Sequence, residues 1–221
     1  MFIPLKDENP TKSFPFVTIS LIVANVLVFL YQYFSPQGLI YYIKVMSLIP
    51  YEITHFVSLP FRLSPPLTLF TSMFMHGDFF HIAGNMLYLW IFGNNVEDFL
   101  GPIKFIFFYT LSGITASFVH IIFHPNSTIP LVGASGAISG ILGAYLLLYP
   151  YARIHTFVFL FFIVRIISVP AFFFLIFWFF MQIINLGVGG VAWFAHIGGF
   201  LFGMLFISTF SGKRRRIRFE N

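Results

Sequence analysis

The sequence predicts an all-α fold: a polytopic membrane protein in which a bundle of six transmembrane helices is accompanied by a membrane-associated first outer loop. Only 9% of the 221 residues are charged, and the mean hydropathy is +0.90. A soluble domain has roughly 25% charged residues, so this chain cannot form an ordinary water-facing surface. The third observation is a set of six apolar runs of about the length that a bilayer crossing needs, which is roughly 20 residues.

Polar or helix-breaking residues separate these runs from one another. In chain order, the six predicted spans cover 16–34, 79–96, 103–123, 134–148, 171–186 and 194–209. The first run is longer than the core of a signal peptide, and no small-residue cleavage site closes it, so we interpret it as an uncleaved span. The predicted organisation is an N-terminal tail over 1–14, a six-span domain over 15–210 and a basic tail over 211–221.

Two stretches between the runs do not fit a simple count of spans. Segment 35–75 is moderately apolar and rich in Pro and Ser. Segment 151–169 is strongly apolar but contains Arg153, His155 and Arg165, and an Arg near the bilayer centre costs at least about 2.5 kcal/mol. We expect both segments to lie against the membrane surface or the helix bundle.

The positive charges predict an orientation. With six spans, ten of the twelve Lys and Arg residues fall on one face of the membrane, and only Lys44 and Arg62 fall on the other. The positive-inside rule then places both termini in the cytoplasm of a multi-pass plasma-membrane protein, with spans two, four and six beginning at the outer face. The basic run 213–218 is interpreted as an anchor at anionic headgroups rather than as a nucleic-acid site.

Several chemistries are excluded by composition. The chain has no Cys, which removes disulfides, thiolate metal sites and cysteine nucleophiles. It has no HExxH motif for a zinc site, and no predicted span carries paired aspartates in its interior. We therefore expect neither a metal nor an organic cofactor.

Polar residues enter the predicted spans in three clusters, each in the first turn at the outer face. Span two opens with His76, followed by His81 and Asn85, which are four residues apart and share one helical face. Span four opens with Ser135 and span six with His196, at equivalent depths. Polar side chains inside a membrane are costly and are functional candidates by default. Asn25, His120 and Gln182 are further polar residues within the other runs.

A serine, a neutral histidine and nearby hydrogen-bond donors are the groups that acyl transfer requires. The serine attacks, the histidine takes and returns the proton, and the donors hold the tetrahedral oxyanion. Five of the seven acidic residues fall on the cytoplasmic side, and only Glu52 and Asp78 lie on the outer side. The simplest interpretation is a dyad of Ser135 and His196, although spacing does not exclude either of the two outer acids.

Small residues provide a way for the two spans to approach each other. Span four carries Gly136 and Gly140 four residues apart, and span six carries Gly199 and Gly203 on the face of His196. Such stripes let helix backbones pack closely in lipid. Packing one stripe on the other would bring the hydroxyl and the imidazole within hydrogen-bond reach.

These motifs resemble those of the rhomboid-type intramembrane serine proteases, in the bacterial or archaeal form with a six-span core. The resemblance covers roughly residues 14–210 and is carried by HGDFFHIAGN at 76–85, GASG at 133–136 and AHIGGFLFG at 195–203. It implies that Ser135 is the nucleophile and His196 the general base. It further implies an oxyanion hole formed by His81, Asn85 and the backbone N–H of Ser135, and single-span membrane proteins as substrates.

The sequence departs from the family pattern at two places. Leu67 and Thr68 stand where many members carry a Trp-Arg pair in the first outer loop, and Ser139 stands where some carry a Tyr stacked on the catalytic imidazole.

Other interpretations also apply to single residues. Ser135 is also interpreted as a helix N-cap, and Asn85 as a residue that forms an interhelical hydrogen bond. For the whole chain, the alternatives are a proteolytically inactive relative that binds or escorts membrane helices, and a small transporter. The sequence does not indicate an oligomeric state.

Overall fold

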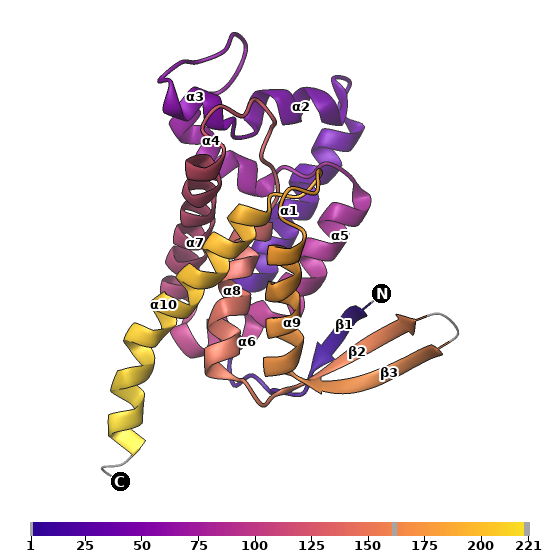
Figure 1. Ribbon diagram of the computed structural model, residues 1–221, viewed down its shortest axis with the longest axis vertical. Coiled ribbons are helices and arrows are strands. Elements are labelled where there is room, and N and C mark those ends of the chain that lie inside the picture. The colour runs from indigo at the N-terminus through magenta and orange to yellow at the C-terminus, as the bar shows by residue number, and fades with distance from the viewer. Residues whose placement is uncertain (1, 161–162, 219–221) are drawn as a thin grey trace.

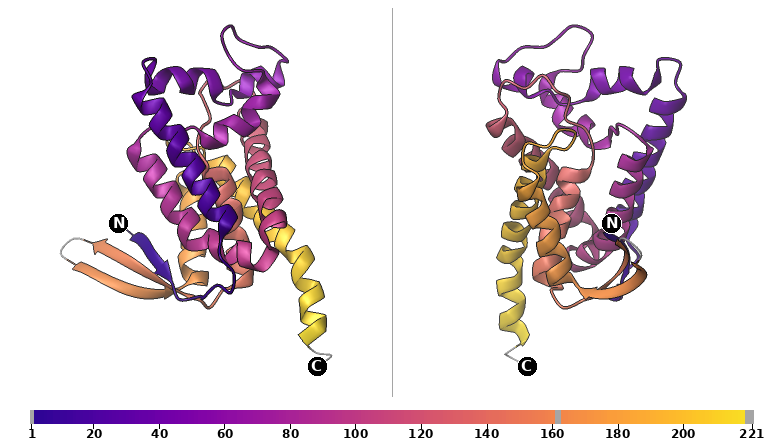
Figure 2. Two further views of the ribbon diagram at one scale, coloured as in Figure 1. Left: turned by 180° about the vertical axis from the view of Figure 1, so that it is seen from behind. Right: turned by 45° about the vertical axis from the view of Figure 1, so that its right-hand side comes forward.

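The computed structural model describes residues 2–160 and 163–218, without the side chains of 160, 163 and 211–218. The basic side chains of 213–218, predicted to anchor the chain at headgroups, therefore lie outside the described part. Figures 1 and 2 show helices packed side by side, with a small sheet near one end. The prediction of a helical membrane protein is supported, because several of these helices are long and apolar.

Three helices in the described ranges are long and apolar enough to cross a membrane. They are α1 (Phe16–Phe34), α7 (Pro102–Phe123) and the first part of α10 (Trp193–Arg218), over Trp193–Phe210. Two shorter apolar helices, α8 (Ser135–Leu148) and α9 (Ala171–Ile184), coincide with the fourth and fifth predicted runs.

The second predicted run forms one continuous helix with an irregular middle. It consists of α5 (Phe79–Tyr88), a π-helical turn η2 (Leu89–Gly93) and α6 (Asn94–Leu100). Asp78 caps its start, since its side chain accepts a hydrogen bond of 2.9 Å from the backbone N–H of His81. Gly101 ends the helix in a conformation with φ of 78°, which favours glycine.

Segment 35–75 lies across the end of the bundle that is opposite the sheet (Figures 1 and 2). It contains α2 (Gly38–Met46), α3 (Pro50–Thr54), α4 (Pro65–Thr71) and a 3₁₀ turn η1 (Ser72–Phe74).

A buried ion pair fixes this segment. The Arg62 and Glu52 side chains are 3.1 Å apart and nearly inaccessible, and Arg62 also donates 2.7 Å to the backbone oxygen of Ser47. The ion pair lies in the same segment as Leu67 and Thr68, the positions at which many family members carry a Trp-Arg pair.

The all-α prediction is wrong in one region, which forms a three-stranded antiparallel sheet. Strand β2 (Arg153–Leu160) pairs with β3 (Ile163–Pro170) as a hairpin, and β1 (Phe2–Asp7) pairs with the other edge of β2. Segment 151–169 thus forms most of a β-hairpin, and its expected position against the membrane surface or the helix bundle stays a prediction. The physical reason for the hairpin is its composition, since alternating β-branched and aromatic residues favour a half-buried strand.

The sheet is tied to the bundle through the Asp7 carboxylate. The Tyr145 hydroxyl donates to this carboxylate at 2.6 Å, and the Asn95 amide donates at 2.8 Å. Burial raises the pKa of Asp7 above its ordinary value, and these hydrogen bonds act in the opposite direction. Strand β1, over Phe2–Asp7, is therefore joined to the helix bundle.

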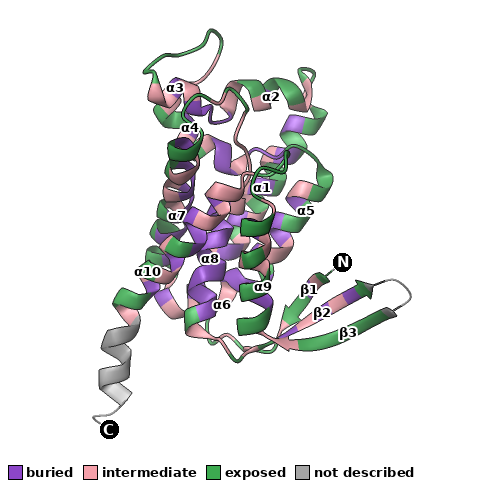
Figure 3. Ribbon diagram, in the orientation of Figure 1, coloured by how far each residue is buried: buried purple, intermediate pink, exposed green. Residues whose placement is uncertain are grey.

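Helix α8 occupies the centre of the bundle, as the buried residues along it show (Figure 3). It contacts α7, α9, α10 and η2. Residues 136–146 are buried without interruption, and they include the large side chains Ile141 and Tyr145. The helix that begins with Ser135 is thus held on all sides by protein.

The Glu97 carboxylate on α6 caps the start of α1 from a distant part of the sequence. One oxygen accepts from the backbone N–H of Val17 at 2.9 Å, and the other accepts from the N–H and hydroxyl of Thr18, both at 2.7 Å. The residue before α1, Pro15, provides no side-chain cap. Glu97 therefore satisfies N–H groups that have no partner inside the helix.

Replacing Glu97 with Gln should lower the free energy of unfolding by about 1–3 kcal/mol, because an amide cannot accept all three charge-assisted hydrogen bonds. Thermal unfolding in detergent micelles measures the change. The matched control is Glu8→Gln, since Glu8 is half-exposed and pairs with His155 at 2.7 Å. That surface pair contributes about 0–1 kcal/mol. Equal effects of the two substitutions would contradict the capping role of Glu97.

Candidate active site

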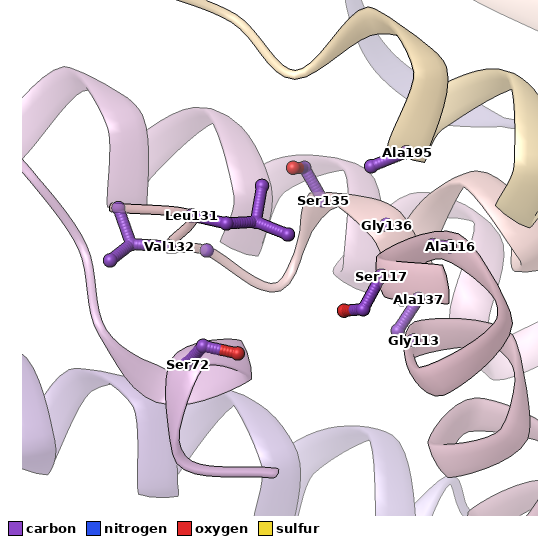
Figure 4. A pocket seen from close by; sticks show the side chains of 11 residues that line it. Ser72, Gly113, Ala116, Ser117, Leu131, Val132, Ser135, Gly136, Ala137 and Ala195 are labelled. Atoms are coloured by element: carbon purple, nitrogen blue, oxygen red, sulfur yellow. The ribbon is translucent and has the colours of Figure 1, made fainter. Parts of the chain in front are cut away.

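Ser135 is the first residue of α8 and lies inside the bundle rather than at its end. At the helical rise of 1.5 Å per residue, the 14 residues of α8 span about 21 Å, less than a hydrocarbon core of about 30 Å. The preceding loop is fixed by two contacts: Gly133 donates 2.9 Å to the backbone oxygen of Ser72, and Leu131 pairs with Leu48. Figure 4 shows the Ser135 side chain between the segment at Leu131 and Ala195 of α10.

The structure brings Ser135 and His196 together. The Nε2 atom of His196, in the first turn of α10, lies 2.9 Å from the Oγ atom of Ser135. Both residues are partly buried and line the same cavity. Their distance is that of a hydrogen bond between a hydroxyl and a ring nitrogen.

Glycines set the separation of the two helices. A Cβ built on Gly199 would fall on the carbonyl oxygen of Gly136, and one built on Gly203 would fall on that of Gly140. Likewise, a Cβ on Gly143 would fall on the carbonyl oxygen of Phe200. The backbones of α8 and α10 thus touch directly along the two stripes, a contact that no side chain larger than hydrogen permits.

His81 and Asn85 of α5 line the same cavity, whose volume is about 860 Å³. The Nδ2 atom of Asn85 is buried and makes no hydrogen bond within the described residues, so a donor is available there. The backbone N–H of Gly77 lies 3.5 Å from Nδ1 of His81, and when Nδ1 accepts from it, Nε2 is the nitrogen that carries the proton. A Cβ on Gly133, whose φ is 111°, would lie 2.7 Å from that Nε2 atom.

Neither of the two outer acids contacts His196 among the described residues. Asp78 caps α5, and Glu52 pairs with Arg62. Instead, the Oε1 atom of Gln182 on α9 lies 2.8 Å from Nδ1 of His196. The sequence signal for this contact was a single amide in an otherwise apolar run, which does not indicate a partner by itself.

Two tryptophan rings lie close to the imidazole of His196, and Ser139 stands at the position where some family members carry a tyrosine. The ring centroids of Trp178 and Trp193 are 6.0 and 6.2 Å from that of His196. Ser139 takes no part in this arrangement, since its hydroxyl donates 2.7 Å to the backbone oxygen of Ser135.

In the described ranges, no group of three or more His, Cys, Asp or Glu residues is arranged to hold a metal ion.

The fold and the site define a helical membrane protein in which a hydrogen-bonded serine and histidine line an open cavity. A model of the rhomboid domain matches residues 65–213, and the chain belongs to the rhomboid family. It is 31% identical over 199 residues to the presenilin-associated rhomboid-like protein, mitochondrial, of Homo sapiens, covering 85% of this chain and 46% of that protein.

Two further relatives are matched over shorter segments. Rhomboid protein 1, mitochondrial, of Saccharomyces cerevisiae is 36% identical over 97 residues, which are 42% of this chain and 28% of the relative. Rhomboid protease GluP of Bacillus subtilis is 42% identical over 78 residues, which are 35% of this chain and 15% of the relative. The chain therefore spans less than half the length of each of these proteins.

The relatives contradict the expected plasma-membrane location. Those of yeast and human are mitochondrial proteins by name, as is a relative in Arabidopsis thaliana, and this points to a mitochondrial membrane. The expectation rested on the distribution of Lys and Arg alone, and that distribution distinguishes the two sides of a membrane but not one membrane from another. The cytoplasmic placement of the termini belonged to the same expectation and is withdrawn with it.

Replacing Gly203 with Ala should destabilise the bundle by about 1–3 kcal/mol, because the new methyl group would force α10 away from α8. The unfolding temperature in detergent measures the effect. Gly84→Ala is the control, since a Cβ at Gly84 of α5 meets no atom within 4 Å. Alanine is favoured over glycine inside a helix by about 0.5–1 kcal/mol, so the control should be at least as stable as the wild type. Equal stability of the Gly203 variant would refute the direct backbone contact.

Proposed function

We propose that this protein is an intramembrane serine endopeptidase, which hydrolyses a peptide bond in or next to the transmembrane helix of a single-span membrane protein. The observation that carries the proposal is the 2.9 Å contact between Ser135 and His196 inside the cavity. Membership of the rhomboid family supports it, and one matched relative is a protease by name.

In this mechanism, the Oγ atom of Ser135 attacks the carbonyl carbon of the scissile bond while Nε2 of His196 takes its proton. The tetrahedral intermediate collapses as His196 returns the proton to the leaving amine, and an acyl-enzyme remains. Water, activated by the same imidazole, then hydrolyses the ester and restores Ser135. This is the general scheme of a serine nucleophile with a histidine base.

The developing oxyanion is stabilised by three donors in the proposed scheme. They are the Nδ2 atom of Asn85, the Nε2 atom of His81 and the backbone N–H of Ser135. The unpartnered amide of Asn85 supports its role, and the N–H of Ser135 is at the start of α8, where such groups have no partner within the helix. Donors that are fixed before the reaction stabilise the transition state without reorganisation.

We further propose that six helices span the bilayer: α1, the continuous helix from α5 to α6, α7, α8, α9 and α10. The shorter α8 is surrounded by protein, and many large apolar side chains on the outer helices are exposed, as a lipid-facing surface requires. In this arrangement, residues 15–210 form the catalytic domain, and the cavity supplies water to a site within the membrane.

Ser135→Ala should abolish cleavage of a single-span reporter protein in liposomes, because loss of the nucleophile removes several orders of magnitude from kcat. Ser112→Ala is the matched control, since Ser112 is a buried helical serine whose hydroxyl bonds to the backbone oxygen of Phe108. This control should cleave at the wild-type rate.

A fluorophosphonate probe should label the wild type and should not label Ser135→Ala or His196→Ala. Full cleavage by Ser135→Ala would refute the assignment, and an unlabelled, inactive wild type would favour a relative that only binds membrane helices.

Asn85→Ala should lower kcat about 10²–10³-fold, as the loss of one oxyanion donor does in serine proteases. The same reporter assay measures the effect. Asn25→Ala serves as control, because Asn25 is a buried asparagine of α1 that donates to the backbone oxygen of Leu21. An unchanged rate with a lowered unfolding temperature would assign Asn85 to helix packing instead.

A further inference from the structure

We propose that Gln182 is a positioning residue that holds His196 in the tautomer and ring orientation required of a general base. This inference rests on the proposed function and assigns to an amide the place that a carboxylate occupies in a Ser-His-Asp triad. Gln182 lies on α9 with only 5% of its surface exposed, and its Oε1 atom is 2.8 Å from Nδ1 of His196. The other ring nitrogen of His196 faces Ser135 at 2.9 Å.

The orientation of the amide is fixed by a second hydrogen bond. The Nε2 atom of Gln182 donates 2.9 Å to the backbone oxygen of Trp178, one turn earlier on α9. Reversing the amide would put its carbonyl oxygen against another carbonyl oxygen and its NH₂ group against the ring. The oxygen of Gln182 therefore faces His196.

That oxygen determines which ring nitrogen carries the proton. An amide oxygen only accepts hydrogen bonds, so Nδ1 of His196 must be the protonated nitrogen. A neutral imidazole then has a bare Nε2, and its lone pair is directed at the hydroxyl of Ser135. This is the state in which the histidine can accept the proton of the nucleophile.

The choice of tautomer matters for catalysis. With the proton on Nε2, the nitrogen that faces Ser135 would have no lone pair to accept the serine proton. In a serine protease, replacing the triad carboxylate with an amide lowers kcat about 10⁴-fold, because that amide selects the wrong tautomer. Here the amide selects the tautomer with a protonated Nδ1. The NH₂ group of Gln182 donates to the Trp178 carbonyl oxygen, so the amide oxygen faces the ring. No carboxylate contacts His196 in the part of the chain that the structure describes, so Gln182 is the partner that Nδ1 has there.

Two substitutions of Gln182 separate positioning from packing. Gln182→Met keeps the volume but removes the acceptor, and it should lower kcat at unchanged KM by about 10–100-fold, the loss that is typical when a metal-ligating histidine loses its hydrogen-bond partner. Gln182→Glu provides a carboxylate that also selects a protonated Nδ1, so it should retain much more activity than Gln182→Met. If Gln182 only filled space, the order would be reversed, because methionine is tolerated in an apolar site and a buried charge is not.

The pH profile gives a readout that packing does not change. A carboxylate beside Nδ1 stabilises the imidazolium, so the acid limb of kcat/KM should move to higher pH in Gln182→Glu. Asp78, His81, His120 and His124 also line the cavity, and their titration is common to wild type and variant. The difference between the two profiles therefore reports on His196.

The control is Asn185→Leu, at the residue that follows the last turn of α9. Asn185 donates 2.7 Å to the backbone oxygen of Met181 four residues earlier, as Gln182 does to Trp178, but it has no hydrogen bond to His196. This variant should cleave the reporter at the wild-type rate. Unfolding temperatures of all variants show whether a loss of rate reflects a loss of folded protein.

A spectroscopic test does not depend on activity. In lipid-reconstituted protein with ¹⁵N-labelled histidine, the His196 signals are assigned by their loss in His196→Ala. We expect a protonated Nδ1 and a bare Nε2 in the wild type, and a shift towards protonated Nε2 in Gln182→Met. A tautomer and a kcat unaffected by Gln182→Met would overturn this inference and leave the proposed protease intact. If the wild type were inactive and unlabelled by the fluorophosphonate, the proposed function would fail, and the ¹⁵N spectra would still decide the role of Gln182.

Discussion

The structure depends on the direct contact between the backbones of α8 and α10. At three glycines, the carbonyl oxygen of one helix occupies the place where a Cβ of the other would be. Lipid provides no hydrophobic drive for helix association, so close packing has to hold the helices together. The same contact sets the distance between the first turns of the two helices, where Ser135 and His196 lie. Stability and the geometry of the site thus have one origin.

Several polar side chains inside this bundle have a hydrogen-bond partner on another element or in the backbone. Glu97 binds the first turn of α1, Glu52 binds Arg62, and Gln182 joins Trp178 to His196. A buried polar group without a partner is costly, which explains these pairings. The Nδ2 atom of Asn85 is one of several buried polar atoms that make no hydrogen bond within the described residues, and Asn85 lines the same cavity as Ser135 and His196.

The sequence predicted the helices because the bilayer imposes a length and an apolar composition on them. The six apolar runs coincide with helices, and the clusters at Ser135 and His196 meet as the glycine spacing suggested. The hairpin at Arg153–Pro170 was missed because its apolar residues carry no hairpin turn signal and resemble a membrane segment. Strand β1 was missed because its partner β2 lies some 150 residues away along the chain.

The partner of His196 was beyond sequence reasoning for a different reason. Whether Gln182 reaches the imidazole depends on the rotation of α9 about its axis and on the path of the loop over 185–192. Neither is encoded in a local pattern. By contrast, the neighbourhood of Ser135 and Gly136 is local, and its motif could be recognised from adjacent residues.

The π-helical turn Leu89–Gly93 has a consequence for the helix in which it lies. Asn85 and Glu97 are twelve residues apart, and in a regular α-helix they would point about 120° away from each other. A wide turn that absorbs one extra residue reduces this angle to about 20°, so both buried side chains face inward. One helix can therefore offer an amide to the cavity and an acid to α1. The wide turn thus absorbs one extra residue without changing which way the two flanking segments face. Deleting one residue there would give a regular helix in which the two side chains are eleven residues apart and still about 20° from each other, whereas regular winding of all twelve residues would turn one of them towards lipid.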